Sequence, residues 1–302
     1  MKSIRAIYLW ILSATLLATA GATAFALPGG GRHTRDIPKS HERELKVSID
    51  AGMSDLTIGH SSSTIVLSAH ADLKDNQDSE IKFNDCIEYE IRDDVGYLDI
   101  ATTGHSDHEQ TKKSGIHFGN FESTDWMLNF TDAIPIAFDI EFGLGDGDID
   151  LSGLAVKDLR LSTGASSVKL RFDKPNREVI EDLTIEAGLS KFKGINLGNA
   201  NFNHLTFEGG VGSYQLDFSG ELSREADVDI EVGLGALTIV IPANVEAKIY
   251  YERSWVAHLT IDKEFVEREE DTYYTPGYSS GRAKLNLNVT AGLGSVTVTR
   301  AR

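Results

Sequence analysis

Residues 228–239 read VDIEVGLGALTI, and residues 287–298 read LNVTAGLGSVTV. In both stretches, apolar and polar residues alternate on either side of a corner centred on a glycine, Gly233 in the first and Gly292 in the second. Alternation with a period of two is typical of a β-strand that buries one face. Each stretch therefore predicts a strand, a glycine corner and a second strand.

The same pattern recurs along most of the chain. An apolar residue stands five and three positions before each corner glycine and one position after it, and the second position after it holds only glycine or serine. We expect glycine at the corner because a positive φ, or the close approach of another backbone, leaves no room for a Cβ atom. The corner glycines are Gly52, Gly143, Gly164, Gly188, Gly210, Gly233 and Gly292.

The spacing of the corner glycines predicts the architecture. From the second to the sixth, successive glycines lie about 21 to 24 residues apart, which is too short for a βαβ unit and fits one coil of a β-solenoid. We therefore expect an all-β, single-domain β-solenoid of about seven glycine-cornered rungs over residues 45–302. Two insertions, 72–134 and 243–282, interrupt the repeat, and each is predicted to contain a hairpin and a loop, the second hairpin turning at Arg253-Ser254.

The N-terminus predicts export. Two basic residues precede an apolar run, and small residues follow up to Ala26, an order that is typical of a secretory signal peptide. We predict a signal peptide over residues 1–26, cleaved after Ala26, and a flexible polar leader over 27–44, so that the protein reaches the periplasm or the cell surface. The alternative is an uncleaved membrane anchor, because residues 6–26 match the roughly 20 residues that span a bilayer.

The charge balance restricts the partners. The chain has 29 basic and 46 acidic residues, which gives a net charge of −17 at pH 7. Such a surface repels nucleic acid and anionic membranes and attracts cations and basic partners. The lone cysteine, Cys86, excludes an internal disulfide framework and a cysteine-rich zinc module.

Three stretches in the middle of the chain are similar to a known family. Residues 126–130 read WMLNF, residues 134–141 read IPIAFDIE, and residues 142–151 read FGLGDGDIDL. Together with the closing stretch 287–299, they resemble the bacterial toast-rack domain of LiaF-like cell-envelope proteins and related adhesin-like β-solenoids. The resemblance implies a β-solenoid at the cell envelope and no catalytic residues. LiaF-like members are linked to regulation of the envelope-stress response to cell-wall antibiotics.

A column of acids is the first candidate site. The residue two positions before the corner glycine is a carboxylate in five of the repeats, Asp50, Glu141, Glu186, Glu208 and Glu231. If the rungs stack in register, neighbouring carboxylates lie about 4.8 Å apart and repel by roughly 0.9 kcal/mol in water. Two interpretations stay open: a solvated polar face, or a ladder that binds divalent cations or a basic ligand.

Three further candidates each have a structural alternative. Residues 146–150 (DGDID) suggest a calcium loop or an outward strand face, and residues 105–109 (HSDHE), with His117 nearby, suggest a zinc or nickel site or a solvated loop. A group of aromatic residues in the second insertion suggests a cap on the solenoid end or an additional partner surface. These residues are Tyr250, Tyr251, Trp255, Tyr273, Tyr274 and Tyr278.

The motif search favours a binding protein over an enzyme. The sequence has no nucleophile elbow, no H-E-x-x-H and no nearby His/Cys pair, so we expect neither catalysis nor a cofactor. We expect an exported, non-catalytic protein that binds, adheres or serves as a scaffold at the cell envelope, with an envelope protein or a polysaccharide as partner. Two alternatives are a LiaF-like regulator of envelope stress and a polysaccharide-acting β-helix enzyme, since such enzymes use acids on a solenoid face.

Overall fold

The computed structural model describes residues 31–73, 83–102, 124–252, 256–279 and 284–301. These residues belong to one compact unit, Gly31–Arg302. The predicted signal peptide, the histidines of residues 105–117 and the Arg253-Ser254 turn lie outside the described residues. Within the described ranges, no helix is both long and apolar enough to cross a membrane.

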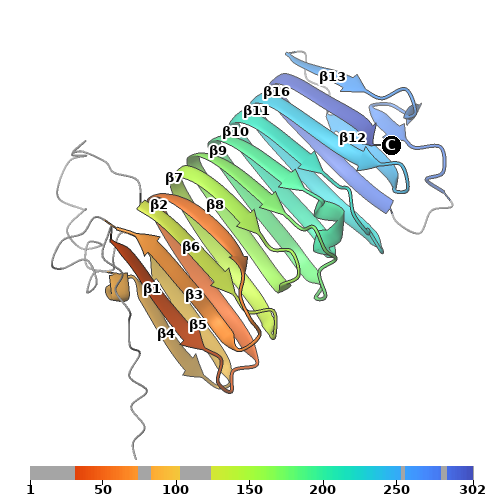
Figure 1. Ribbon diagram of the computed structural model, residues 1–302. Helices are drawn as coiled ribbons and strands as arrows, with labels where there is room; N and C mark the ends of the chain where they lie inside the picture. The colour runs from red at the N-terminus through yellow and green to blue at the C-terminus, as the bar shows by residue number, and fades with distance from the viewer. Residues whose placement is uncertain (1–30, 74–82, 103–123, 253–255, 280–283, 302) are drawn as a thin grey trace, which may run out of the picture. The chain divides into compact units, whose positions relative to one another are not determined.

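The described part of the chain is nearly all β-structure and forms one 16-stranded sheet (Figure 1). Its long strands are neighbours in chain order, and each pairs in parallel with the next. Each of them contains one of the glycine corners. They are β2 (Glu44–His60), β7 (Pro135–Asp150), β8 (Ala155–Arg171), β9 (Ile180–Ile195), β10 (Phe202–Asp217), β11 (Glu225–Pro242) and β16 (Lys284–Ala301).

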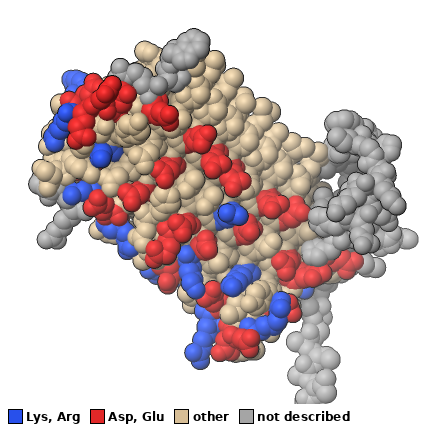
Figure 2. Space-filling view, turned by 180° about the vertical axis from the view of Figure 1, so that it is seen from behind, with Lys and Arg blue, Asp and Glu red and all other residues tan. Residues whose placement is uncertain are grey.

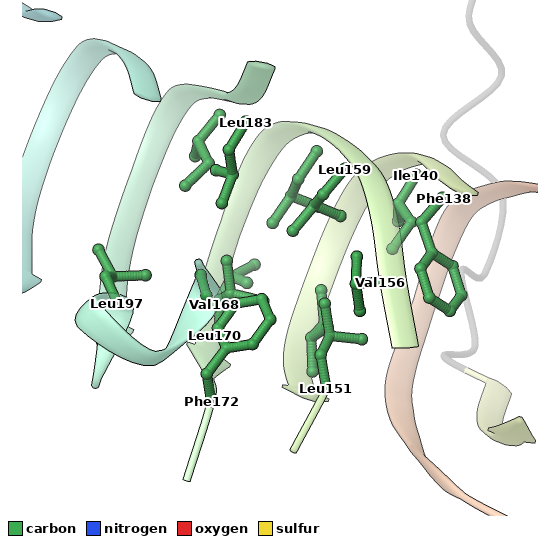
Figure 3. Packing of buried hydrophobic residues seen from close by; sticks show 14 of the residues in the cluster. Phe138, Ile140, Leu151, Val156, Leu159, Val168, Leu170, Phe172, Leu183 and Leu197 are labelled. Atoms are coloured by element: carbon green, nitrogen blue, oxygen red, sulfur yellow. The ribbon is translucent and has the colours of Figure 1, made fainter. Parts of the chain in front are cut away.

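Each long strand bends over at its corner, so that its two halves face each other across the core (Figures 1 and 3). In β8, Leu159 and Leu161 before the corner and Val168 and Leu170 after it are all buried. The residues at the same positions of the neighbouring strands are buried beside them, such as Leu183 of β9. The parallel register thus stacks apolar side chains into continuous columns, which bury one face of every strand.

Buried asparagines satisfy the backbone where the chain returns between long strands. The Asn176 side chain accepts the Val156 N–H (2.9 Å) and donates to the carbonyls of Val156 (2.7 Å) and Ala200 (3.1 Å). The Asn199 side chain, which belongs to the short 3-10 helix η2 (Leu197–Ala200), donates to the Phe172 carbonyl (2.8 Å). Because unpaired backbone groups are costly inside a protein, these amides hold the return loops in place.

Two short strands lie beside the first long strand and two beside the last, each pairing with one half of that long strand. We call each such pair of short strands a split rung, and the set of long strands the stack. At one end, β5 (Val95–Ala101) pairs with the first half of β2, and β6 (Thr124–Phe130) pairs with its second half. At the other end, β12 (Glu246–Glu252) and β13 (Ala257–Ile261) pair in the same way with the two halves of β16. The prediction of a hairpin that turns at Arg253-Ser254 is therefore wrong, because β12 and β13 both pair in parallel with β16 and do not pair with each other.

Antiparallel strands cover the split rungs. The hairpin predicted in the first insertion is confirmed, since β4 (Ile87–Arg92) pairs antiparallel with β5. β3 (Ile65–Asp72) pairs with β6, and β1 (Arg32–Pro38), which lies within the predicted leader, pairs with β3. At the other end, β15 (Thr272–Tyr274) joins β12, and β14 (Val266–Glu269) joins β15.

The corner has two constrained positions rather than one. At the first, a Cβ on Gly143 would lie 2.2 Å from the Gly52 carbonyl oxygen of the neighbouring strand. The second position lies two residues after the corner glycine of each strand. In β11 it is held by Gly235, which has a φ of +144° and whose Cβ would lie 1.9 Å from the Gly212 carbonyl oxygen. Close backbone contact thus acts at both positions, whereas the positive φ falls at the second and not at the glycine on which the sequence repeat is centred.

We predict that Gly235→Ala destabilises the protein by about 2 to 4 kcal/mol, because it adds backbone strain and a clash with the next strand. Gly188→Ala is the matched control, since its Cβ would lie 3.1 Å from the nearest carbonyl oxygen, and it should cost clearly less. Urea unfolding followed by circular dichroism measures both. Equal losses for the two variants would contradict the contact at the second corner position.

Candidate functional site

The acid column predicted from the sequence is in register. Backbone pairing places Asp50 opposite Glu141, Glu186 opposite Glu208, and Glu208 opposite Glu231. Ser162 separates the first pair from the remaining three, and Thr290 follows them. Glu252 of β12 lies opposite Thr290 and extends the column. Sequence reasoning missed Glu252 because a split rung has no corner glycine on which to align it.

The acid column has little compensation from positive charge. Glu141, Glu186, Glu208 and Glu231 are exposed, and no Lys or Arg among the described residues forms an ion pair with any of them. Its hydrogen bonds come from hydroxyls, such as that of Ser162, which donates to the Glu186 carboxylate (3.3 Å). Figure 2 shows a face of the molecule over which acidic side chains are spread. The column is therefore a strip of negative charge on the outside of the sheet.

A row of exposed apolar side chains runs beside the acid column. Its members are exposed by 43% to 63% and lie in register, Leu189 opposite Val211, Val211 opposite Leu234, and Leu234 opposite Leu293. Large apolar side chains in contiguous exposed patches mark interaction surfaces. We call this row the apolar ladder; it consists of Leu189, Val211, Leu234 and Leu293. Leu144 of β7 is also exposed, but it lies opposite Ala165 of β8 and pairs with no member of the ladder.

The ladder occupies the position after the corner glycine, which the sequence pattern grouped with the apolar core positions. The structure places this position outside, because two successive residues, such as Gly188 and Leu189, both face outward at the corner. Ser190, two residues after the glycine, is buried again, and Phe192 is the first large apolar side chain after the corner to enter the core. The bend in the chain thus interrupts the period of two that holds on either side of it.

Two shallow hollows lie beside the acid column, with corner glycines among their lining residues. One, of 410 Å³, is lined by Glu186, Glu208 and Glu231 together with Gly188, Gly210 and Gly233. The other, of 360 Å³, is lined by Asp50, Glu141 and Glu186 together with Gly52, Gly143, Gly164 and Gly188. Because the glycines carry no side chains, the backbone is bare next to the carboxylates. The strands β9, β10 and β11 thus each present, in order, a carboxylate, a bare backbone and a ladder residue.

The acids of residues 146–150 form an outward strand face. Asp148 and Asp150 both pair with Arg171, at 3.2 and 3.0 Å. Partial burial raises the pKa of the Asp150 carboxyl, but hydrogen bonds from Ser152 and the nearby Arg171 guanidinium outweigh it and hold this pKa below its ordinary value. Among the residues that the structure describes, no group of three or more His, Cys, Asp or Glu side chains is arranged to hold a metal ion.

The aromatic group of the second insertion packs mainly against the end of the stack. Tyr251 and Tyr274 are buried, and the Tyr274 ring meets the Tyr278 ring edge-on with 5.2 Å between their centroids. The Tyr278 hydroxyl donates to the Asn286 side chain of β16 (2.6 Å). Tyr250 is exposed by 43%. These contacts favour the cap interpretation for the described members of the group; Trp255 lies outside the described residues.

Comparisons with known proteins identify a family model and distant structures. The model of the N-terminal domain of toast_rack (DUF2154) matches residues 29–193 and 174–240. The crystal structure of a proposed cell adhesion protein from Clostridium sporogenes is 18% identical with a TM-score of 0.45, over 90% of this chain and 100% of that one. That of a proposed adhesin from Bacteroides fragilis is 13% identical with a TM-score of 0.30, over 90% and 99%. The comparison with curated proteins gave no match, and the description of the matching family model names no catalytic activity.

We predict that the triple variant Glu186→Gln, Glu208→Gln, Glu231→Gln is more stable than the parent chain. It removes the repulsion between stacked carboxylates, so its Tm should rise by about 2 °C in low salt and the gain should shrink as salt screens the charges. Differential scanning calorimetry at two salt concentrations measures the shift. Glu270→Gln, which neutralises an exposed acid outside the column, is the control. A lower Tm for the triple variant would contradict the repulsion and show that the carboxylates make contacts that stabilise the fold.

We predict that Asp150→Asn destabilises the protein by about 0.5 to 1 kcal/mol at pH 7. Because the folded-state pKa of Asp150 is lowered, its contribution is present above the unfolded pKa and is lost as the pH falls through the folded one. The two chains should therefore have equal stability near pH 2. Asp217→Asn is the matched control, since Asp217 accepts the Ser219 N–H as Asp150 accepts that of Ser152, without an Arg partner among the described residues. A pH-independent difference would contradict the ion pair.

Proposed function

Because the chain belongs to the family of the toast-rack N-terminal domain, we propose that it is an exported, non-catalytic protein of the cell envelope that works by binding, in adhesion or as a scaffold. The observation that carries this proposal is the apolar ladder. Soluble proteins seldom leave a contiguous file of large apolar side chains in water unless it serves an interaction. Its regular repetition on successive strands favours an extended contact over a pocket for a small molecule.

The architecture supports this role. We interpret the bent long strands as rungs of a solenoid, about seven in number, each adding roughly 4.8 Å to the stack. A stack of this kind presents a surface roughly 30 Å long whose side chains are spaced by the backbone hydrogen bonds. Such a rigid surface requires little ordering on binding, which lowers the entropic cost of contact with a large partner.

The location is part of the proposal. A signal peptide over residues 1–26, cleaved after Ala26, would deliver residues 27–302 to the periplasm or the cell surface. There the partner would be an envelope protein or a polysaccharide.

The proposal predicts that the ladder retains the protein at the envelope. In the cells that produce the chain, the double variant Leu189→Ser, Leu234→Ser should fold normally, because both positions are exposed, and its envelope-bound fraction should fall at least tenfold. Fractionation with immunoblotting measures the bound fraction, and mass spectrometry of the mature N-terminus tests cleavage after Ala26.

Met127→Ser, Val266→Ser is the matched control, because Met127 and Val266 are exposed by 47% and 51% on β6 and β14, away from the ladder. This variant should be retained like the parent chain. If the ladder variant is retained as well as the control, or if the parent chain is never exported, the proposed function is wrong.

A further inference from the structure

We infer that the apolar ladder and the acid column form one docking surface for a basic, amphipathic segment of another polypeptide. This inference rests on the proposed binding function and adds to it the chemistry of the partner. The surface is defined by Glu186, Glu208 and Glu231 on one side and by Leu189, Val211 and Leu234 on the other. The hollow of 410 Å³ borders the three carboxylates and the corner glycines that follow them.

The two rows are held in a fixed relation by the backbone. Each carboxylate stands three residues before a ladder residue on the same strand, so the two rows are at most about 10 Å apart. The pairing of β9 with β10 and of β10 with β11 keeps both rows in register over three successive strands. A ligand that follows the stack therefore meets an apolar contact and a negative charge at every strand.

Charge complementarity selects the partner. Some acids outside the column are compensated internally, as Glu44 is by Lys157 (2.7 Å) and Asp150 by Arg171 (3.0 Å). The exposed glutamates of the acid column have no such ion pair among the described residues. The surface repels nucleic acid and anionic lipid, and a second copy of this chain would bring the same net charge of −17. A basic partner supplies the missing charge.

The ladder requires that the basic partner is also apolar. A free cation would leave the exposed leucines and valines in water, and a purely polar polycation would do the same. A polypeptide segment that combines Lys or Arg with Leu or Val buries the ladder and brings its cationic ends to the hollows beside the carboxylates. The apolar side chains of the ladder and the carboxylates of the acid column then each have a complementary contact.

The inference makes stability and binding respond in opposite directions. Neutralising the acid column relieves repulsion in the free protein and removes the attraction for the partner. The same substitutions should thus raise Tm and weaken binding. A surface whose acids served only folding would not show this pair of effects.

The test is a titration of the full chain with a synthetic 14-residue peptide of alternating Leu and Lys, followed by isothermal titration calorimetry. Two further peptides of equal length separate the contributions, one in which Ser replaces Leu and one in which Glu replaces Lys. We expect the Leu/Lys peptide to bind at least tenfold more tightly than either, and its affinity to fall with added salt. Glu208→Gln, Glu231→Gln and Leu189→Ser, Leu234→Ser should each weaken it at least tenfold, and Met127→Ser should leave it unchanged.

Several results would overturn the inference. If the Ser/Lys peptide bound as tightly as the Leu/Lys peptide, binding would depend on net charge alone. If the Leu/Glu peptide bound as tightly, binding would depend on apolar contact alone. Binding of anionic phospholipid vesicles through the ladder would make it a membrane surface. A rise in Tm with calcium alone that Glu231→Gln abolishes would make the acid column a metal site. If no peptide binds while the ladder still retains the protein at the envelope, the inference of a basic, amphipathic partner is wrong and the proposed function stands.

Discussion

The structure depends on the close contact of neighbouring backbones at the corners. There the next strand passes so near that a single Cβ atom would overlap a carbonyl oxygen, as at Gly143 and Gly235. A larger residue would push the strands apart and disturb the parallel pairing on both sides of the bend. That pairing in turn aligns the core columns, the acid column and the apolar ladder. Small residues at the corner are thus the common requirement of the fold and of the candidate binding surface.

Most of the regular part of this fold could be predicted from the sequence. Alignment on the corner glycines placed the residues that face the core, and it placed Glu186, Glu208 and Glu231 in one column, which the backbone pairing confirms. This succeeds because parallel, in-register strands convert equal sequence offsets into spatial neighbours. The family resemblance is likewise shown by the match to the toast-rack model.

The remaining features follow from contacts that a single repeat does not contain. The exposure of Leu189 arises because the bend turns two successive residues outward, so the period of two fails where the chain changes direction. The strands β12 and β13 resemble a hairpin in sequence, although both pair with β16. β1 is a polar segment whose strand form depends on the edge that β3 offers. Tertiary pairing decides all three.

The pairing of each long strand with its immediate neighbours has an evolutionary consequence. Because β9 pairs with β8 and β10, duplication of one unit of about 22 residues could insert another coil without altering the chemistry of the rest. The length of the molecule can therefore change in steps of roughly 4.8 Å, while the terminal segments continue to seal whichever coils are outermost. A lineage could adjust the length of the sheet by gene-level copying instead of by redesigning the interior.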